Sequence, residues 1–117
     1  MLFCRRTKDP YKGLYNFVGG KVEPGEGRFE AAYRELWEET GIGRNEICLF
    51  ELMDLTYYAQ GFVLEVYVGR LRENVKLVEE VNPLEWLPLT ENFADAGRFA
   101  GDQNIPPMVV EALRFPL

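Results

Sequence analysis

Histidine is absent from this sequence of 117 residues. Its absence excludes catalysis by Ser-His-Asp or Cys-His groups and any metal site built on histidine. Acid–base chemistry would then fall to carboxylates, lysine, tyrosine or water activated by a metal. The two cysteines, Cys4 and Cys48, have apolar neighbours and no metal-type spacing. We therefore expect two buried free thiols rather than a disulfide.

Long apolar runs are absent too, and the first residues lack the apolar core and cleavage site of a signal peptide. We therefore expect a cytoplasmic protein with no membrane partner. The formal net charge is −6, so the chain lacks the basic excess of a protein that binds nucleic-acid polymers. Small phosphate-bearing ligands are compatible with this charge, because a bound metal and local arginines can offset the carboxylates.

The stretch from Arg28 to Thr40 contains no glycine or proline and is rich in Glu, Ala, Arg and Leu, which predicts a helix. Gly41 follows where a C-cap glycine is expected. At 100° per residue, one face of this helix is apolar. Its predicted members are Phe29, Tyr33, Leu36 and Trp37, with Ala32 at the edge.

Three glutamates of this helix, Glu35, Glu38 and Glu39, fall on the opposite face, with Ala31 leaving that face open at one end. Their spacing makes like charges neighbours, and negative charge near a helix C-terminus also opposes the macrodipole. Such a conflict with local stability is typical of a functional site. A hard divalent cation bound by carboxylate oxygens would remove it. The alternative is an acidic face that simply meets solvent.

The surrounding spacing decides between these interpretations. The chain matches Gly-x5-Glu-x7-Arg-Glu-Leu-x-Glu-Glu-x-Gly-Ile without a mismatch. The matching residues are Gly20, Glu26, Arg34, Glu35, Leu36, Glu38, Glu39, Gly41 and Ile42. This pattern is the Nudix box, and the chain resembles a Nudix hydrolase.

The resemblance implies an α/β (α+β) fold, with a mixed β-sheet sandwiched between helices, in a single domain over residues 1–117. Apolar patterns predict strands that agree with it, over residues 2–6, 14–18, 47–57, 62–71 and 84–87, with a short one around Val75, Leu77 and Val78. Trp86 is expected in the core. A second helix is expected from Asp102, capped by Asp102 or Asn104, with Met108, Val109, Ala112 and Leu113 packed inward. Nudix domains usually carry another strand before Leu2, so either the sheet is trimmed there or residues precede Met1.

The same resemblance implies one to three Mg²⁺ ions, with Mn²⁺ as a substitute. The implied ligands are Glu35, Glu38, Glu39 and the carbonyl of Gly19. Arg34 is expected to orient a box carboxylate, and Glu26 to hold the loop and Arg34. Gly20 and Gly41 are structural members of the box.

The general base in members of the MutT type is a glutamate a few residues before a Glu-Trp pair. Glu80 fits that layout ahead of Glu85-Trp86, and we assign it as base and as a further metal ligand. Its neighbour Glu79 is the alternative. Together with Arg34, Glu38 and Glu39, Glu80 forms the predicted catalytic set.

The same resemblance implies Arg5 or Arg6 near the phosphates or base, and Asn104 as a reader of a purine edge, for which an amide has the donor and acceptor. Phe17 is a candidate stacking surface for the base. Asn104 could equally be a plain helix cap. We expect a small nucleotide as substrate and a monomer or homodimer.

The function implied is hydrolysis of a pyrophosphate bond in a nucleoside triphosphate, with oxidised purines such as 8-oxo-dGTP as candidates. Dinucleoside polyphosphates and ADP-ribose are the alternative substrates. A module that binds nucleotides without hydrolysing them is the alternative of another class.

Overall fold

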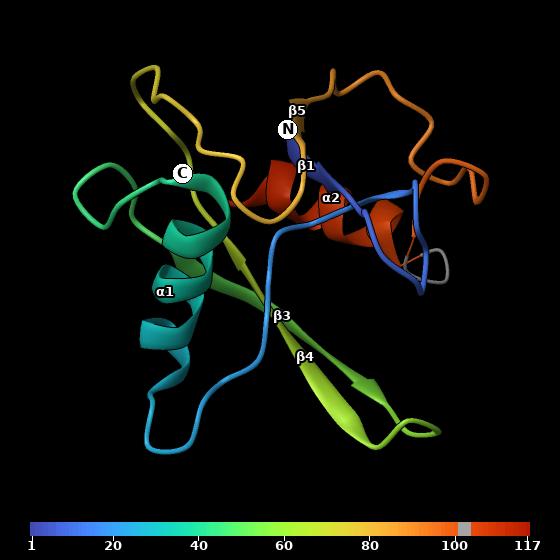
Figure 1. The fold of residues 1–117 in the computed structure, drawn as a ribbon, viewed down its shortest axis with the longest axis horizontal. Helices are drawn as coiled ribbons and strands as arrows, with labels where there is room; N and C mark the ends of the chain where they lie inside the picture. The colour runs from blue at the N-terminus through green and yellow to red at the C-terminus, as the bar shows by residue number, and fades with distance from the viewer. Residues whose placement is uncertain (101–103) are drawn as a thin grey trace.

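A computed structural model describes residues 1–100 and 104–117 (Figure 1). Three strands, β1 (Leu2–Arg5), β2 (Tyr15–Asn16) and β5 (Leu84–Trp86), form one antiparallel sheet in the order β2-β1-β5. The strands β3 (Phe50–Tyr57) and β4 (Phe62–Val68) form an antiparallel hairpin with a register shift between Glu51 and Met53. The helices are α1 (Arg28–Thr40) and α2 (Ile105–Arg114). The predicted α/β class is confirmed.

The hairpin lies between the two helices (Figure 1). On the α1 side, the Phe29 and Tyr67 rings meet edge to face at 4.9 Å. On the α2 side, the two ends of β3 contact the two ends of the helix. The ring of Phe50 lies 5.4 Å from that of Phe115, and the hydroxyl of Tyr57 meets Asn104.

The helix predicted over residues 28–40 is confirmed at both ends. Gly41 has the left-handed backbone expected of a C-cap, with φ 76°, and its N–H donates to the carbonyl of Trp37. The buried face differs from the prediction, because Ala31 and Thr40 are buried whereas Trp37 is 60% exposed and Phe29 is exposed. The helix therefore turns its glutamate side partly toward the protein interior.

The apolar core lies between the three-stranded sheet and α2. It consists of Phe3, Leu87, Phe93, Phe99, Ile105 and Val109, with Met1, Tyr15 and Phe17 packed against it. Phe3 is fully buried, and its ring stacks on those of Phe17 and Phe93 with centroids 4.8 and 5.6 Å away. Leu113 is 57% exposed, which corrects the expectation that it packs inward.

Several predicted strands were too long. Residues 47–49 stay outside β3 because the N–H of Leu49 donates to the hydroxyl of Tyr33 rather than to a strand. The predicted strand around Val78 is wrong, because its N–H donates to the carbonyl of Thr40 at the end of α1. Trp86 is also not in the core. It is 55% exposed, and Leu87 is buried in its place.

The cysteines are both free, as predicted, and Cys4 is buried. Cys48 is exposed, which corrects the expectation of burial and follows from its place outside β3. In α2, Asn104 takes the N-cap position but makes no side-chain cap bond, and Asp102 lies outside the described residues. No helix in the described ranges combines the length and apolarity needed to cross a bilayer.

Candidate active site

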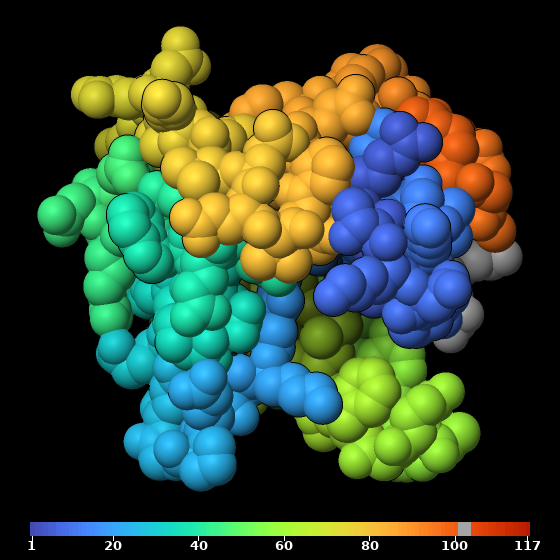
Figure 2. Space-filling view, in the orientation of Figure 1, coloured from blue at the N-terminus to red at the C-terminus, as the bar shows by residue number. Residues whose placement is uncertain are grey.

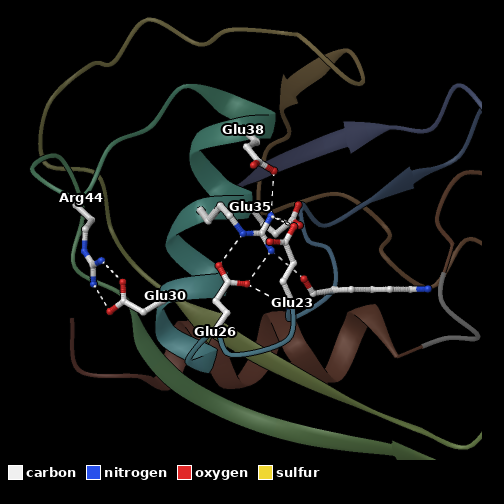
Figure 3. A network of polar contacts seen from close by, with 8 residues as sticks. Glu23, Glu26, Glu30, Glu35, Glu38 and Arg44 are labelled. Atoms are coloured by element: carbon white, nitrogen blue, oxygen red, sulfur yellow. Dashed lines mark hydrogen bonds and ion pairs between the residues drawn. The ribbon is translucent and has the colours of Figure 1, made fainter.

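Arg34 is the centre of a network of charged groups on α1 and the loop before it (Figure 3). Its Nε and Nη2 donate to the two carboxylate oxygens of Glu26 at 2.7 and 3.0 Å. Its Nη1 donates to Glu35 at 2.8 Å and to Glu38 at 3.1 Å. Its Nη2 also donates to the carbonyl of Lys21 at 2.9 Å. We call these five residues the Arg34 network.

The Arg34 network offsets the repulsion that the box spacing creates. One guanidinium lies between two glutamates of the helix, and it connects them to the loop through Glu26. Hydrogen bonds to Glu26 and then Glu35 raise the pKa of Arg34 above its ordinary value. The same contact lowers the pKa of Glu26. Both groups therefore stay charged across the physiological pH range.

Glu39 is not one of the five residues of this network. One of its carboxylate oxygens accepts a hydrogen bond from the N–H of Gly19 at 3.0 Å. Burial raises the pKa of Glu39, the charges of Glu35 and Glu38 raise it further, and the Gly19 bond and the charge of Arg6 lower it. Burial is thus the main cause of the raised pKa of Glu39, and repulsion from the neighbouring carboxylates is a smaller one.

Gly20 explains why the loop can approach the helix so closely. A Cβ atom at this position would lie 2.2 Å from the carboxyl carbon of Glu35. At Gly19 the same atom would meet nothing within 4 Å. The first glycine of the box is therefore required by the position of Glu35, whereas its neighbour is not under that constraint.

The segment that carries Glu80 is fixed at one end to the last residue of α1 and at the other end to β1. The N–H of Val78 donates to the carbonyl of Thr40 at 2.8 Å, and the N–H of Arg5 donates to the carbonyl of Pro83 at 2.9 Å. Within the segment, a carboxylate oxygen of Glu79 accepts from the N–H of Leu84 at 2.7 Å. Glu79 thus closes the loop, while Glu80 is exposed and makes no side-chain hydrogen bond to another described residue.

The predicted substrate residues lie in different surroundings. The Nε groups of Arg5 and Arg6 donate to the carbonyls of Gly13 and Pro10, at 3.2 and 2.7 Å. The charge of Arg6 lowers the pKa of Glu39. Phe17 is half-buried and stacks on Phe3, so most of its ring belongs to the core. Asn104 binds Tyr57 at the start of α2.

Several contacts of the site were not anticipated from the sequence. The carbonyl of Lys21 binds Arg34, and the side chain of Glu23 approaches Arg34 at 3.8 Å. The amide oxygen of Asn82 accepts from the N–H and hydroxyl of Thr7, at 3.1 and 3.0 Å, which ties the Glu80 segment to the loop after β1. Backbone carbonyls carry no sequence signal, and the Thr7–Asn82 pair spans 75 positions.

A surface hollow of about 430 Å³ borders the Arg34 network, and Glu30, Arg34 and Trp37 contribute to its lining. Trp37 is thus an exposed wall of this hollow, not a member of the apolar core (Figure 2 shows the α1 surface at the left). The Arg44 guanidinium lies 4.3 Å from the centre of the Tyr33 ring and pairs with Glu30.

The donor set fits a hard divalent cation, because it consists of carboxylate oxygens with mutual repulsion to relieve. No three acidic or cysteine side chains among residues 1–100 and 104–117 are arranged to enclose a metal here. In the structure, oxygens of Glu35 and Glu38 accept hydrogen bonds from Arg34. The assigned ligands Gly19, Glu35, Glu38, Glu39 and Glu80 stay predictions.

Comparison with known proteins decides the family. The sequence model of the NUDIX domain family matches residues 1–107. The chain belongs to this family. It is a Nudix hydrolase, 34% identical over 96 residues to the 8-oxo-dGTP diphosphatase of Escherichia coli K12. That alignment covers 81% of this chain and 74% of the relative.

Two solved structures share the Nudix fold. A Caenorhabditis elegans Ap4A hydrolase in a binary complex superposes with a TM-score of 0.67 at 22% identity, covering 97% of this chain and 82% of the other. The NUDIX domain of Shewanella oneidensis NrtR, solved with ADP ribose, gives 0.71 at 20% identity, with coverages of 97% and 75%. Proteins of this fold therefore bind several classes of nucleotide.

Proposed function

We propose that this Nudix hydrolase cleaves a pyrophosphate bond of a nucleoside triphosphate, releasing a nucleoside monophosphate and pyrophosphate. Purine nucleotides, including oxidised ones such as 8-oxo-dGTP, are the first candidates. The observation that carries the proposal is the Arg34 network beside Glu39, which gathers the box glutamates on one flank of α1. The resemblance to the 8-oxo-dGTP diphosphatase supports the substrate class.

Glu35, Glu38, Glu39, Glu80 and the carbonyl of Gly19 would hold Mg²⁺ or Mn²⁺. When bound, the ion would neutralise charge on the phosphoryl oxygens and lower the pKa of the attacking water. Arg34 keeps Glu35 and Glu38 side by side in spite of their like charge. Glu26 keeps the guanidinium in place through two hydrogen bonds.

Glu80 serves as the general base. As the oxygen of water bonds to phosphorus, a carboxylate oxygen of Glu80 accepts its proton, the bridging P–O bond breaks, and pyrophosphate leaves with the electron pair. Glu79, the alternative base, is engaged by the N–H of Leu84, whereas Glu80 is exposed. The exposed position of Glu80 and the fixed ends of its segment support the assignment.

A substrate panel tests the proposal. The purified protein with Mg²⁺ is given dNTPs, 8-oxo-dGTP, ADP-ribose and Ap4A, and release of pyrophosphate is scored separately from release of phosphate. We expect the highest kcat/KM with a purine triphosphate, and pyrophosphate as a product. Highest activity on ADP-ribose or Ap4A would reject the substrate class, and binding without turnover would reject catalysis.

The variant Glu38→Gln tests the metal site. It keeps the size of the side chain but removes its charge. We therefore expect turnover to fall by more than the roughly 10–100-fold loss typical of residues that only hydrogen-bond to metal ligands. Glu73→Gln, the same change at an exposed position, is the control and should keep full activity. Full activity of a folded Glu38→Gln protein would contradict the assignment. Glu80→Gln tests the base in the same assay, and a small loss of kcat would move that role elsewhere.

A further inference from the structure

The end of β3 and the start of α2 are joined by one side-chain hydrogen bond. The amide Nδ2 of Asn104 donates to the hydroxyl oxygen of Tyr57 at 2.7 Å, across 47 positions of the chain. Both side chains are half-buried. A short bond in such a partly shielded place restricts both partners more than an exposed bond would.

The Tyr57 hydroxyl is itself held in place. Its ring stacks on that of Phe62, the first residue of β4, with centroids 4.7 Å apart and planes 18° from parallel. The next residue, Tyr58, is 91% exposed. Of these two adjacent tyrosines, Tyr57 is packed and bonded to Asn104, whereas Tyr58 faces solvent.

Asn104 occupies the N-cap position of α2, but its side chain does not cap the helix. An asparagine at an N-cap normally bonds to backbone N–H groups of the first turn. Here the backbone of Asn104 is already helical, with φ −81° and ψ −16°, and the side chain makes no cap bond. Its amide is turned toward Tyr57 instead. Capping of α2 therefore does not explain why residue 104 carries an amide side chain.

An asparagine amide has two N–H donors and one carbonyl acceptor. One N–H is engaged by Tyr57. The second N–H and the carbonyl oxygen are left as a donor and an acceptor, the two kinds of group through which an amide binds the edge of a purine base. Without the tyrosine hydroxyl, the amide could rotate about its last side-chain torsion, which is soft.

We propose that Tyr57 is a positioning residue for base selection, which holds the Asn104 amide so that its remaining donor and acceptor bind a purine edge. The inference rests on the proposed function, because it takes the substrate to be a nucleotide. It adds that preference for purine over pyrimidine nucleotides depends on a tyrosine hydroxyl outside the Nudix box.

Four variants test it: Tyr57→Phe, Tyr58→Phe, Asn104→Ala and the double variant Tyr57→Phe/Asn104→Ala. Tyr57→Phe keeps the ring and its stacking on Phe62 and removes only the hydroxyl. Tyr58→Phe is the matched control, the same change one residue along. For each protein, kcat and KM are measured with a purine and a pyrimidine triphosphate, and Kd with their non-hydrolysable analogues.

We expect Tyr57→Phe to lower the purine preference about 3- to 10-fold, the range of one hydrogen bond. The change should come from KM and Kd for the purine nucleotide, with kcat and the melting temperature nearly unchanged. Asn104→Ala should lower the preference at least as much. In the Asn104→Ala background, Tyr57→Phe should add nothing, because its effect passes through Asn104. Tyr58→Phe should match the wild type.

An unchanged purine preference in Tyr57→Phe would overturn the inference and leave the proposed function intact. An unchanged preference in Asn104→Ala, or additive effects in the double variant, would overturn it as well. If the wild type bound purine analogues selectively but hydrolysed no nucleotide, the proposed reaction would fail, and the Kd values alone would decide the role of Tyr57. Absence of any selective binding would reject both.

Discussion

The two halves of the molecule are held together by different forces. The half built from β1, β2, β5 and α2 surrounds an apolar core in which Phe3 is fully buried between aromatic rings. The half built on α1 buries only Ala31 and Thr40 of its helix, and the Arg34 network connects that helix to its loop. Apolar burial does not depend on the direction of a contact, whereas the network depends on charge and on direction. The apolar core and the candidate site thus lie in different parts of the molecule.

Truncation of the apolar core should have the largest effect. Phe3→Ala removes a ring that contacts Phe17, Phe93 and Phe99. We expect a loss of about 3–5 kcal/mol in the free energy of unfolding, the usual cost of deleting a buried phenylalanine. Urea denaturation measures it. A loss comparable to that of an exposed residue such as Val63→Ala would show that this half is not the stabilising one.

Arg34→Lys tests the other half. Lysine keeps the positive charge but lacks the planar fork that reaches Glu26, Glu35 and Glu38 together. We expect turnover to fall about 10–100-fold, the range for groups that orient metal ligands. The urea midpoint should change far less than in Phe3→Ala. If turnover were preserved, charge alone would be sufficient and the directed bonds would be unimportant.

The sequence predicts the two halves unequally well. The bounds of α1 follow from local signals, namely the absence of glycine and proline inside it and Gly41 after it. The strand expected around Val78 fails because its N–H has a partner at the end of α1, nearly forty positions away. The short β5 gives too few alternating positions to show whether Trp86 or Leu87 points inward.

The residues of the candidate site were predictable, but many of their contacts were not. The box spacing names Glu35, Glu38 and Glu39, yet only the structure separates the two that bind Arg34 from the one that binds the N–H of Gly19. The Tyr57–Asn104 bond joins segments 47 positions apart and has no local signal. Sequence patterns indicate which residue types a site needs, whereas the contacts between those residues depend on the fold.

Gly20→Ala should sharpen the distinction between fold and chemistry. The new Cβ would displace the carboxylate of Glu35, the flexible end of its side chain, so the fold should survive while the Arg34 network is disturbed. We expect turnover to fall about 10-fold, the lower end for an altered ligand environment. Gly27→Ala, in the same loop, where a Cβ would meet only the side chain of Glu30 at 3.6 Å, is the control and should have little effect. Equal losses in both variants would point to the loop backbone instead.

Labelling of the two thiols has the smallest expected effect. It compares the accessibility of Cys4 in the apolar half with that of Cys48 outside it. Burial, and then the charge of Glu39, raise the pKa of Cys4, while Cys48 is exposed. Because the thiolate is the reactive form, a raised pKa leaves less of it at any given pH, and burial also blocks the reagent. Alkylation at pH 8 followed by mass spectrometry should therefore modify Cys48 first and leave turnover unchanged, with Cys4 reacting after urea is added. Equal labelling of both in the folded protein would mean that β1 opens readily and that the apolar half is not the rigid one.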